Sequence, residues 1–168
     1  MVRSRQNDNI KNIKLNLIGN NVYGVLKKLE SLKNLIINEN PAVIFFQETQ
    51  VKRSGQIKTP SSQNYTWYEL NRTKNAPEGE KGGGVAIGIQ NGLEPSWISE
   101  GDDDVEVTTV EIWIDEFPVR LICGYGPQEY DGKDRKDKFW TYCNKDVQSA
   151  KEDGAAVILQ TDGNCWSG

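Results

Sequence analysis

Five polar side chains could share one chemical task, because each follows an apolar run that is typical of a β-strand: Asn21, Glu48, Tyr125, Asp162 and Asn164. Strand ends are rigid and meet at a common rim, so they can direct side chains towards one point. Two carboxylates with amides and a phenol nearby suit a hard divalent cation and a phosphate, since Mg²⁺ takes oxygen ligands. Such a cation polarises a phosphoryl oxygen and neutralises developing negative charge.

Each of these residues also has an ordinary structural explanation. Glu48 could lie in a surface turn, Asp162 opens an Asp-Gly turn dipeptide, and Asn21 could cap a following helix. The glycines at 82–84 typically join a loop to a strand. They form neither a P-loop, because no Gly-Lys-Ser/Thr follows, nor a dinucleotide-binding loop, because Ile87 occupies the last glycine position. The combination therefore carries more weight than any single residue.

Composition excludes several kinds of chemistry. The 168 residues contain no histidine, which removes Ser-His-Asp and Cys-His catalysis, His-ligated metals and imidazole acid–base steps. The three cysteines form no C-x-x-C pair, so a thiolate zinc site is excluded. The net charge of −4 argues weakly against nucleic-acid binding through charge alone, without excluding an enzyme that contacts DNA or RNA locally.

The sequence shows no targeting or membrane-spanning segment. The first twenty residues are polar and Asn-rich, and no run reaches the roughly 18 apolar residues that a transmembrane helix needs. We therefore expect an intracellular protein, nuclear or cytoplasmic and not secreted, with reduced thiols.

The elements that must position these side chains are predicted from apolar periodicity. Apolar residues recur every three or four positions at 25–38 and 134–152, which predicts two helices. Alternating or continuous apolar runs predict strands at 13–17, 42–46, 65–70, 85–89, 105–114, 119–123 and 156–160. A turn at Glu116 and Phe117 would join two of these strands in a hairpin. This order predicts an α/β (α+β) fold with helices on a largely antiparallel β core.

Five motifs, in family order, resemble those of the endonuclease/exonuclease/phosphatase superfamily between residues 12 and 166. In chain order they are Asn-Val-Tyr-Gly at 21–24 ahead of a Lys-x-x-x-Leu helix, Gln-Glu-Thr at 47–49, Lys-Gly-Gly-Gly-Val at 81–85, Cys-Gly-Tyr-Gly-Pro-Gln at 123–128 and Thr-Asp-Gly-Asn at 161–164. The last two look most like the endonuclease domains of non-LTR retroelements.

The resemblance implies a DNase I-like fold, a two-layer β-sandwich flanked by helices, and Mg²⁺-dependent hydrolysis of phosphodiesters, with Mn²⁺ as an alternative metal. The substrate would be DNA by preference, or RNA, cut to 3′-hydroxyl and 5′-phosphate ends, with no membrane partner. Glu48 would be the main metal ligand, and Asn21 would assist at metal and phosphate. Tyr125 would contact the scissile phosphate, Asp162 would position or activate the attacking water, and Asn164 would orient the phosphate or that Asp. Gln47 and Thr49 would be structural partners.

The sequence departs from the family pattern after the last motif. The family has a further acidic residue and a terminal Ser-Asp-His there, whereas this chain has no histidine. We therefore expect residues 11–168 to form an incomplete, truncated domain. Residues 1–10 are expected to be a flexible N-terminus. The isolated chain should be inactive or impaired, since losing one electrostatic donor costs on the order of 10²–10³ in rate.

Several alternatives stay open at this point. The chain could be a fragment of a longer polyprotein, completed by another segment or chain, or a degenerate copy. It could be a non-catalytic interaction or assembly module that reuses part of the fold. It could also be a phosphatase of the same superfamily, which would use Glu48, Asp162 and Asn164 as well.

Overall fold

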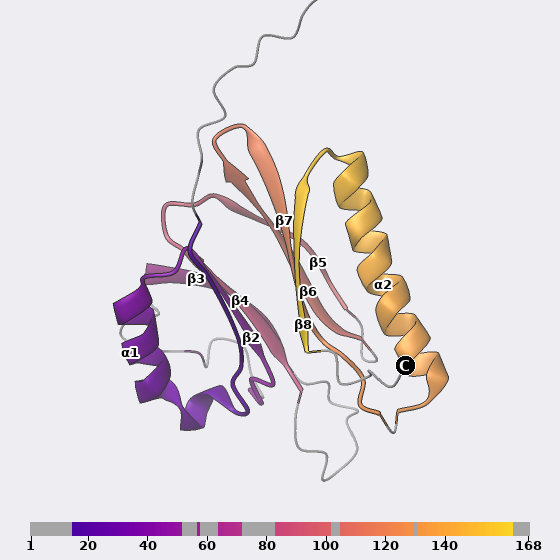
Figure 1. The fold of residues 1–168 in the computed structure, drawn as a ribbon, viewed down its shortest axis with the longest axis horizontal. Helices are drawn as coiled ribbons and strands as arrows, with labels where there is room; N and C mark the ends of the chain where they lie inside the picture. Colours follow the sequence, from indigo (N-terminus) through magenta and orange to yellow (C-terminus); the bar gives the residue numbers. More distant parts are fainter. Residues whose placement is uncertain are drawn as a thin grey trace, which may run out of the picture.

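The computed structural model describes residues 15–51, 57, 64–71, 83–101, 105–129 and 131–162. Within them, two four-stranded sheets face each other, and each sheet carries one α-helix on its outer side (Figure 1). The predicted α/β fold, with two β-layers flanked by helices, is confirmed. The predicted flexible segment 1–10 lies outside the described residues.

The first sheet has the strand order β1-β2-β4-β3. Its strands are β1 (Leu17–Asn21), β2 (Val43–Gln47), β3 (Tyr65–Leu70) and β4 (Val85–Gln90). Strands β1 and β2 are parallel and the other pairs are antiparallel. All five residues of β2 are buried, which explains its continuous apolar run. A 3₁₀ turn (Val25–Lys27) and helix α1 (Leu29–Glu39) connect β1 to β2.

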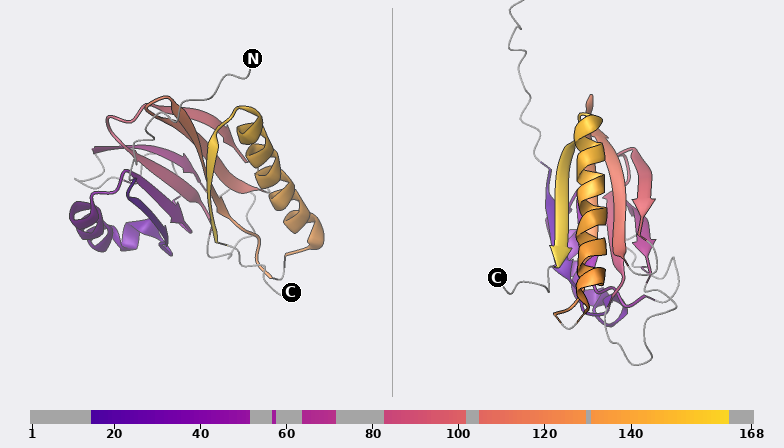
Figure 2. Two further views of the ribbon diagram at one scale, coloured as in Figure 1. Left: turned by 45° about the horizontal axis from the view of Figure 1, so that its top comes forward. Right: turned by 90° about the vertical axis from the view of Figure 1, so that its right-hand side faces the viewer.

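The second sheet has the strand order β5-β6-β7-β8. Its strands are β5 (Pro95–Glu100), β6 (Glu106–Ile114), β7 (Phe117–Tyr125) and β8 (Ala156–Asp162). Here β7 and β8 are the parallel pair, joined by helix α2 (Lys133–Glu152), which lies along the outer face of the sheet (Figure 2). Each sheet therefore contains one strand–helix–strand unit.

The main core lies between the sheets. One layer contributes Val43, Phe45, Val85, Ile87 and Ile89, and the other contributes Val110, Ile112, Val119, Leu121 and Cys123. Helix α1 adds an apolar cluster on its own side through Leu32 and Ile36. No described helix is both long and apolar enough to cross a bilayer.

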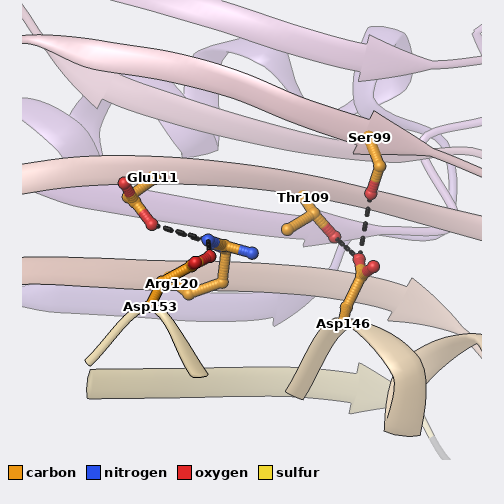
Figure 3. A network of polar contacts seen from close by, with 6 residues as sticks. All are labelled: Ser99, Thr109, Glu111, Arg120, Asp146 and Asp153. Carbon is orange, nitrogen blue, oxygen red and sulfur yellow. Dashed lines mark hydrogen bonds and ion pairs between the residues drawn. The ribbon is translucent and has the colours of Figure 1, made fainter. Parts of the chain in front are cut away.

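Helix α2 is also held by buried polar contacts (Figure 3). Asp146 on the helix is buried and accepts hydrogen bonds from Thr109 and, at 3.0 Å, from Ser99. The side chain of Arg120, which is 3% exposed, pairs with Glu111 at 2.7 Å and with Asp153 at 3.0 Å. Burial alone would lower the pKa of Arg120, but these two carboxylates outweigh it and raise the pKa.

Several predicted element boundaries were wrong. The first strand was predicted at 13–17 but covers Leu17–Asn21, because that segment pairs in register with β2; residues 13 and 14 lie outside the described residues. The helix predicted at 25–38 begins as a 3₁₀ turn, and its α-helical part covers Leu29–Glu39. Phe117 is the first residue of β7 rather than part of the turn, where Asp115 takes the positive φ of 53°.

Two larger features were missed. Strand β5 was not predicted, because an edge strand that is exposed over most of its length shows no alternation of apolar and polar residues. The core is also less antiparallel than expected, since each sheet includes a parallel pair beside its helix. Strands β7 and β8 each end two residues beyond the predicted apolar runs. Tyr125 and Asp162 are therefore the last residues of their strands.

Candidate active site

The parallel strands of both sheets end at the same side of the molecule. Asn21, Tyr125 and Asp162 are the last residues of β1, β7 and β8, and Glu48 directly follows β2. Asn21 is in register with Gln47, and Tyr125 with Asp162. The C-terminal tips of β2 and β8 accordingly point to the same end of the sandwich (Figure 1).

Two hydrogen bonds join these residues across the gap between the sheets. The Asn21 Nδ2 group donates to Asp162 Oδ2 at 2.5 Å, which connects the edge strands β1 and β8. The Tyr125 hydroxyl donates to Glu48 Oε1 at 2.9 Å, which connects the inner strands β2 and β7. The structure therefore brings four of the five predicted side chains together in two contacts. Asn164, the fifth, lies outside the described residues.

Glu48 is the most constrained of the four residues. It is 8% exposed, and its Oε2 atom is buried without a hydrogen-bond partner among the described residues. An unpaired buried carboxylate oxygen is costly, so this position suits a bound cation. The backbone of Glu48 has a φ of 52° and is held in place because its carbonyl accepts from Gly24 N at 2.8 Å, while Thr49 N donates to Gly84 O at 3.0 Å.

The metal shell would not be built from protein carboxylates alone. The described residues contain no group of three or more His, Cys, Asp or Glu side chains that could hold an ion. Mg²⁺ commonly binds through one or two carboxylates and keeps several waters or substrate oxygens. Glu48 fits that mode of binding, and the remaining positions would fall to water and phosphate.

Tyr125 stands between the carboxylates as a neutral donor. Burial raises the pKa of Tyr125, and the hydrogen bond and charge of Glu48 together with the charges of Asp162 and Glu106 raise it further. The phenol therefore stays protonated at physiological pH. Tyr125 donates to Glu48 and is in register with Asp162, so the two carboxylates lie at the same end of the sandwich.

The sequence motifs did not assign a role to Gln128. Its Nε2 group donates to the Tyr125 hydroxyl, which leaves the phenol proton directed at Glu48. Its backbone N–H donates to Asp131 Oδ2 at 2.6 Å, and Asp131 Oδ1 pairs with Arg135 on α2 at 3.0 Å. The start of α2 thereby helps to position Tyr125.

Glu106 was missed by the sequence reasoning altogether. It is buried at the start of β6, in register with Tyr125, and its Oε2 accepts from Gly84 N at 2.7 Å. The only available signal was a charged residue at the beginning of a strand that is otherwise buried. Gln47 also links the sheets, with Nε2 at 3.6 Å from Cys123 Sγ and at 3.4 Å from Gln160 O. Burial raises the pKa of the Cys123 thiol, so it stays neutral.

The profile of the Endonuclease/Exonuclease/phosphatase family matches residues 20–159. The chain belongs to this family. The matched stretch includes Asn21, Glu48 and Tyr125 and ends before Asp162. Enzymes of the family are metal-dependent phosphodiesterases that generally use Mg²⁺, and the buried Glu48 oxygen fits such an ion. No curated protein sequence matches the chain.

Solved structures show the same DNase I-like family fold. TDP2 from C. elegans superposes with a TM-score of 0.68 and 17% identity, over 90% of this chain and 48% of TDP2. The endonuclease domain of TRAS1, a telomere-specific non-LTR retrotransposon, superposes with a TM-score of 0.59 and 13% identity. The match covers 91% of this chain and 62% of the TRAS1 chain. The 3′-5′ exonuclease NExo from Neisseria meningitidis superposes with a TM-score of 0.61 and 14% identity. The match covers 89% of this chain and 58% of the NExo chain.

The chain spans about half the length of the C. elegans TDP2 chain. Two family structures contain nucleic acid: TDP2 from D. rerio with a single-strand DNA product, and NExo with a product DNA hairpin. The family and the fold are therefore shown, while the retroelement subtype is not singled out among these neighbours.

Proposed function

We propose that residues 20–162 hold the metal and phosphate site of a Mg²⁺-dependent DNA phosphodiesterase, a nicking endonuclease of the retroelement type. The observation that carries this proposal is the unpaired, buried Oε2 atom of Glu48 beside the neutral donor Tyr125. The DNA products held by D. rerio TDP2 and NExo support a polynucleotide substrate. The Gly-Tyr-Gly-Pro-Gln segment at 124–128 supports the finer retroelement assignment.

The site residues divide the work of hydrolysis between the two sheets. A Mg²⁺ ion held by Glu48 would polarise a phosphoryl oxygen and neutralise developing charge. The Asn21 amide donates to Asp162 and the Tyr125 hydroxyl donates to Glu48, and both donors would bind phosphate oxygens of the substrate. Asp162 accepts from Asn21 and would orient the attacking water by accepting a hydrogen bond from it.

The reaction then proceeds by attack of that water on phosphorus. A bond forms between the water oxygen and phosphorus, and the bond from phosphorus to O3′ breaks. The attacking water releases its proton through Asp162 to solvent. The 3′ oxygen leaves as a hydroxyl after taking a proton from solvent, and the fragment downstream of the cut keeps the phosphate at its 5′ end. Asn164 would assist by orienting the phosphate or Asp162.

The activity of a polypeptide with this sequence is proposed to be weak. The chain contains no imidazole, and Tyr125 does not ionise near neutral pH. Loss of one preorganised donor in a phosphate site costs on the order of 10²–10³ in rate. We therefore expect nicking to be detectable only at high enzyme concentration.

The test combines metal binding with plasmid nicking. We expect Mn²⁺ binding, followed by electron paramagnetic resonance, to be lost in Glu48→Gln, because the substitution keeps an acceptor for Tyr125 but removes the charged oxygen. Slow Mg²⁺-dependent relaxation of supercoiled plasmid should disappear with it. Glu116→Gln, in the β6–β7 turn, is the matched control and should change neither measurement. Unchanged Mn²⁺ affinity in Glu48→Gln would contradict the metal assignment.

A further inference from the structure

Tyr23 combines an exposed aromatic ring with a strained backbone directly beside the candidate active site. It is 58% exposed and has a φ of 46°, in the left-handed region. A bulky L-residue is disfavoured in that region, where Gly, Asn or Asp would be the usual choice. Neither burial nor backbone preference therefore accounts for a tyrosine at this position.

The backbone around Tyr23 is fixed by hydrogen bonds to site residues. Tyr23 N–H donates to Asn21 Oδ1 at 3.1 Å, and the amide of the same Asn21 side chain donates to Asp162. On the other side, Gly24 N donates to Glu48 O at 2.8 Å. The segment that carries the ring is thus attached to both the amide and the metal-binding side of the site.

The neighbours of Tyr23 show that its exposure is not a sign of loose packing. Val22 and Val25 are 1% and 0% exposed and belong to the α1-side core. The fold therefore exposes the ring to solvent while it buries Val22 and Val25 in the same short segment. Strained residues that persist in a well-packed segment are concentrated at functional sites.

An exposed aromatic ring next to a phosphate site has a specific use in nucleic-acid binding. Each base has a π-face, so an aromatic ring can stack on an unpaired base of any sequence. A base inside a regular duplex is already stacked on its neighbours and does not offer that face.

We propose that Tyr23 is a stacking platform for an unstacked nucleobase adjacent to the phosphate bound at Asn21. The platform gives the site a preference for single-stranded or locally distorted DNA over regular duplex. This inference rests on the proposed function, because it requires a polynucleotide at the same site.

The experiment measures oligonucleotide binding by fluorescence anisotropy in EDTA, so that it depends on neither metal nor hydrolysis. The two probes are a single-stranded DNA oligonucleotide and an oligonucleotide of equal length made of abasic residues. Tyr23→Ala should weaken binding of the first on the order of tenfold and leave the second unchanged. Tyr23→Phe should keep the affinity for both probes.

Two further variants separate stacking from folding. Tyr23→Gly relieves the positive φ, so its melting temperature should stay level or rise while its affinity for the base-containing probe falls. Phe117→Ala removes an aromatic ring that is 68% exposed at the opposite end of β7 from Tyr125, and it should bind both probes as the wild type does.

The remaining outcomes overturn the stacking role. If Tyr23→Ala binds the base-containing probe normally, or loses affinity for both probes equally, the stacking role is wrong while the proposed function stands. If the wild-type protein binds neither probe in EDTA, the stacking role fails, while the proposed function is decided by the Mn²⁺-binding and nicking measurements.

Discussion

The two strand–helix–strand units of the molecule, β1-α1-β2 and β7-α2-β8, solve the same problem in different ways. Each places one side chain from an edge strand and one from an inner strand at the site, and the contacts run edge to edge and inner to inner. Helix α1 packs on its sheet through apolar side chains such as Leu32 and Ile36. Helix α2 adds the hydrogen bonds of the buried Asp146, and Asp153 at its C-terminal end pairs with the buried Arg120.

The difference has a physical meaning. Apolar packing is non-directional, so it fixes the distance of a helix from its sheet better than its position along the sheet. Hydrogen bonds depend on angle and distance, so they specify the position of α2 along its strands. The start of α2 supports Tyr125 through Arg135, Asp131 and Gln128, and precise placement of α2 therefore matters for the site.

The largest difference between the units should appear at Arg120. Arg120→Ala leaves the largely buried carboxylate of Glu111 without its cation, and breaking such a pair from one side costs about 3 kcal/mol. Asp153 is 57% exposed, so the loss of its pair should add little. Urea unfolding should show a loss of that size. Lys133→Ala, which breaks the exposed pair with Asp137 on the same helix, should cost about 0.5 kcal/mol or less. Equal losses in the two variants would show that the buried Arg120–Glu111 pair contributes no more to stability than an exposed pair.

A smaller loss is expected at Asp146. Asp146→Ala leaves the Ser99 and Thr109 hydroxyls without their shared acceptor, at a cost of about 2 kcal/mol. Adding Thr109→Val should recover part of that loss, because an apolar replacement no longer needs a hydrogen bond. A double-mutant cycle by thermal unfolding measures the coupling. Strict additivity of the two substitutions would argue against a directional contact.

The α1 unit should tolerate change better. Ile36→Val removes one methylene from the α1 cluster and should cost about 1 kcal/mol without altering the site. Mn²⁺ affinity, measured together with stability, should therefore be unchanged in this variant. A marked fall in Mn²⁺ affinity would show that α1 positions Glu48 as strictly as α2 positions Tyr125.

The smallest expected effect is an alkaline one at the contact between the units. The folded protein holds the Tyr125 proton more tightly than the unfolded chain, whose tyrosines titrate near pH 10. This contribution is complete below pH 10 and is lost as the pH rises above it. Tyr125→Phe should therefore flatten the decline in stability above about pH 10. An unchanged alkaline slope would mean that Tyr125 is not held as a neutral donor.

Much of the architecture could be predicted from local patterns. The five-residue run of β2 could be recognised as a strand because it is continuously apolar and buried on both faces. The amphipathic pattern at 134–152 predicted the bounds of α2 to within one residue. Strand β5 was not predicted because its side chains are mostly exposed and show no apolar pattern. The contact partners of Asp146 and Arg120 could not be found, because a charged residue in a periodic segment is ordinarily read as solvent-facing.

In the candidate site, too, some features could be predicted from local sequence patterns and others could not. Asn21, Glu48, Tyr125 and Asp162 were expected to meet because each ends or follows a strand, and they do meet. Their catalytic roles stay predictions. Glu106 was assigned no role, because its contacts depend on the register between β6 and β7 and on the approach of the two sheets, which no short motif encodes. Gln128 was assigned none because its contact with Tyr125, three residues away, depends on the conformation of the loop after β7.

The buried carboxylate of Glu106 accepts the Gly84 N–H, and the Gly84 carbonyl accepts from the residue that follows Glu48. A side chain of the second sheet, Glu106, thus holds the loop of the first sheet that carries Glu48, the proposed metal ligand. A slight parting of the layers, well short of denaturation, would release that loop. The proposed Mn²⁺ binding and nicking should consequently be lost at milder heat or denaturant than the circular-dichroism signal of the strands.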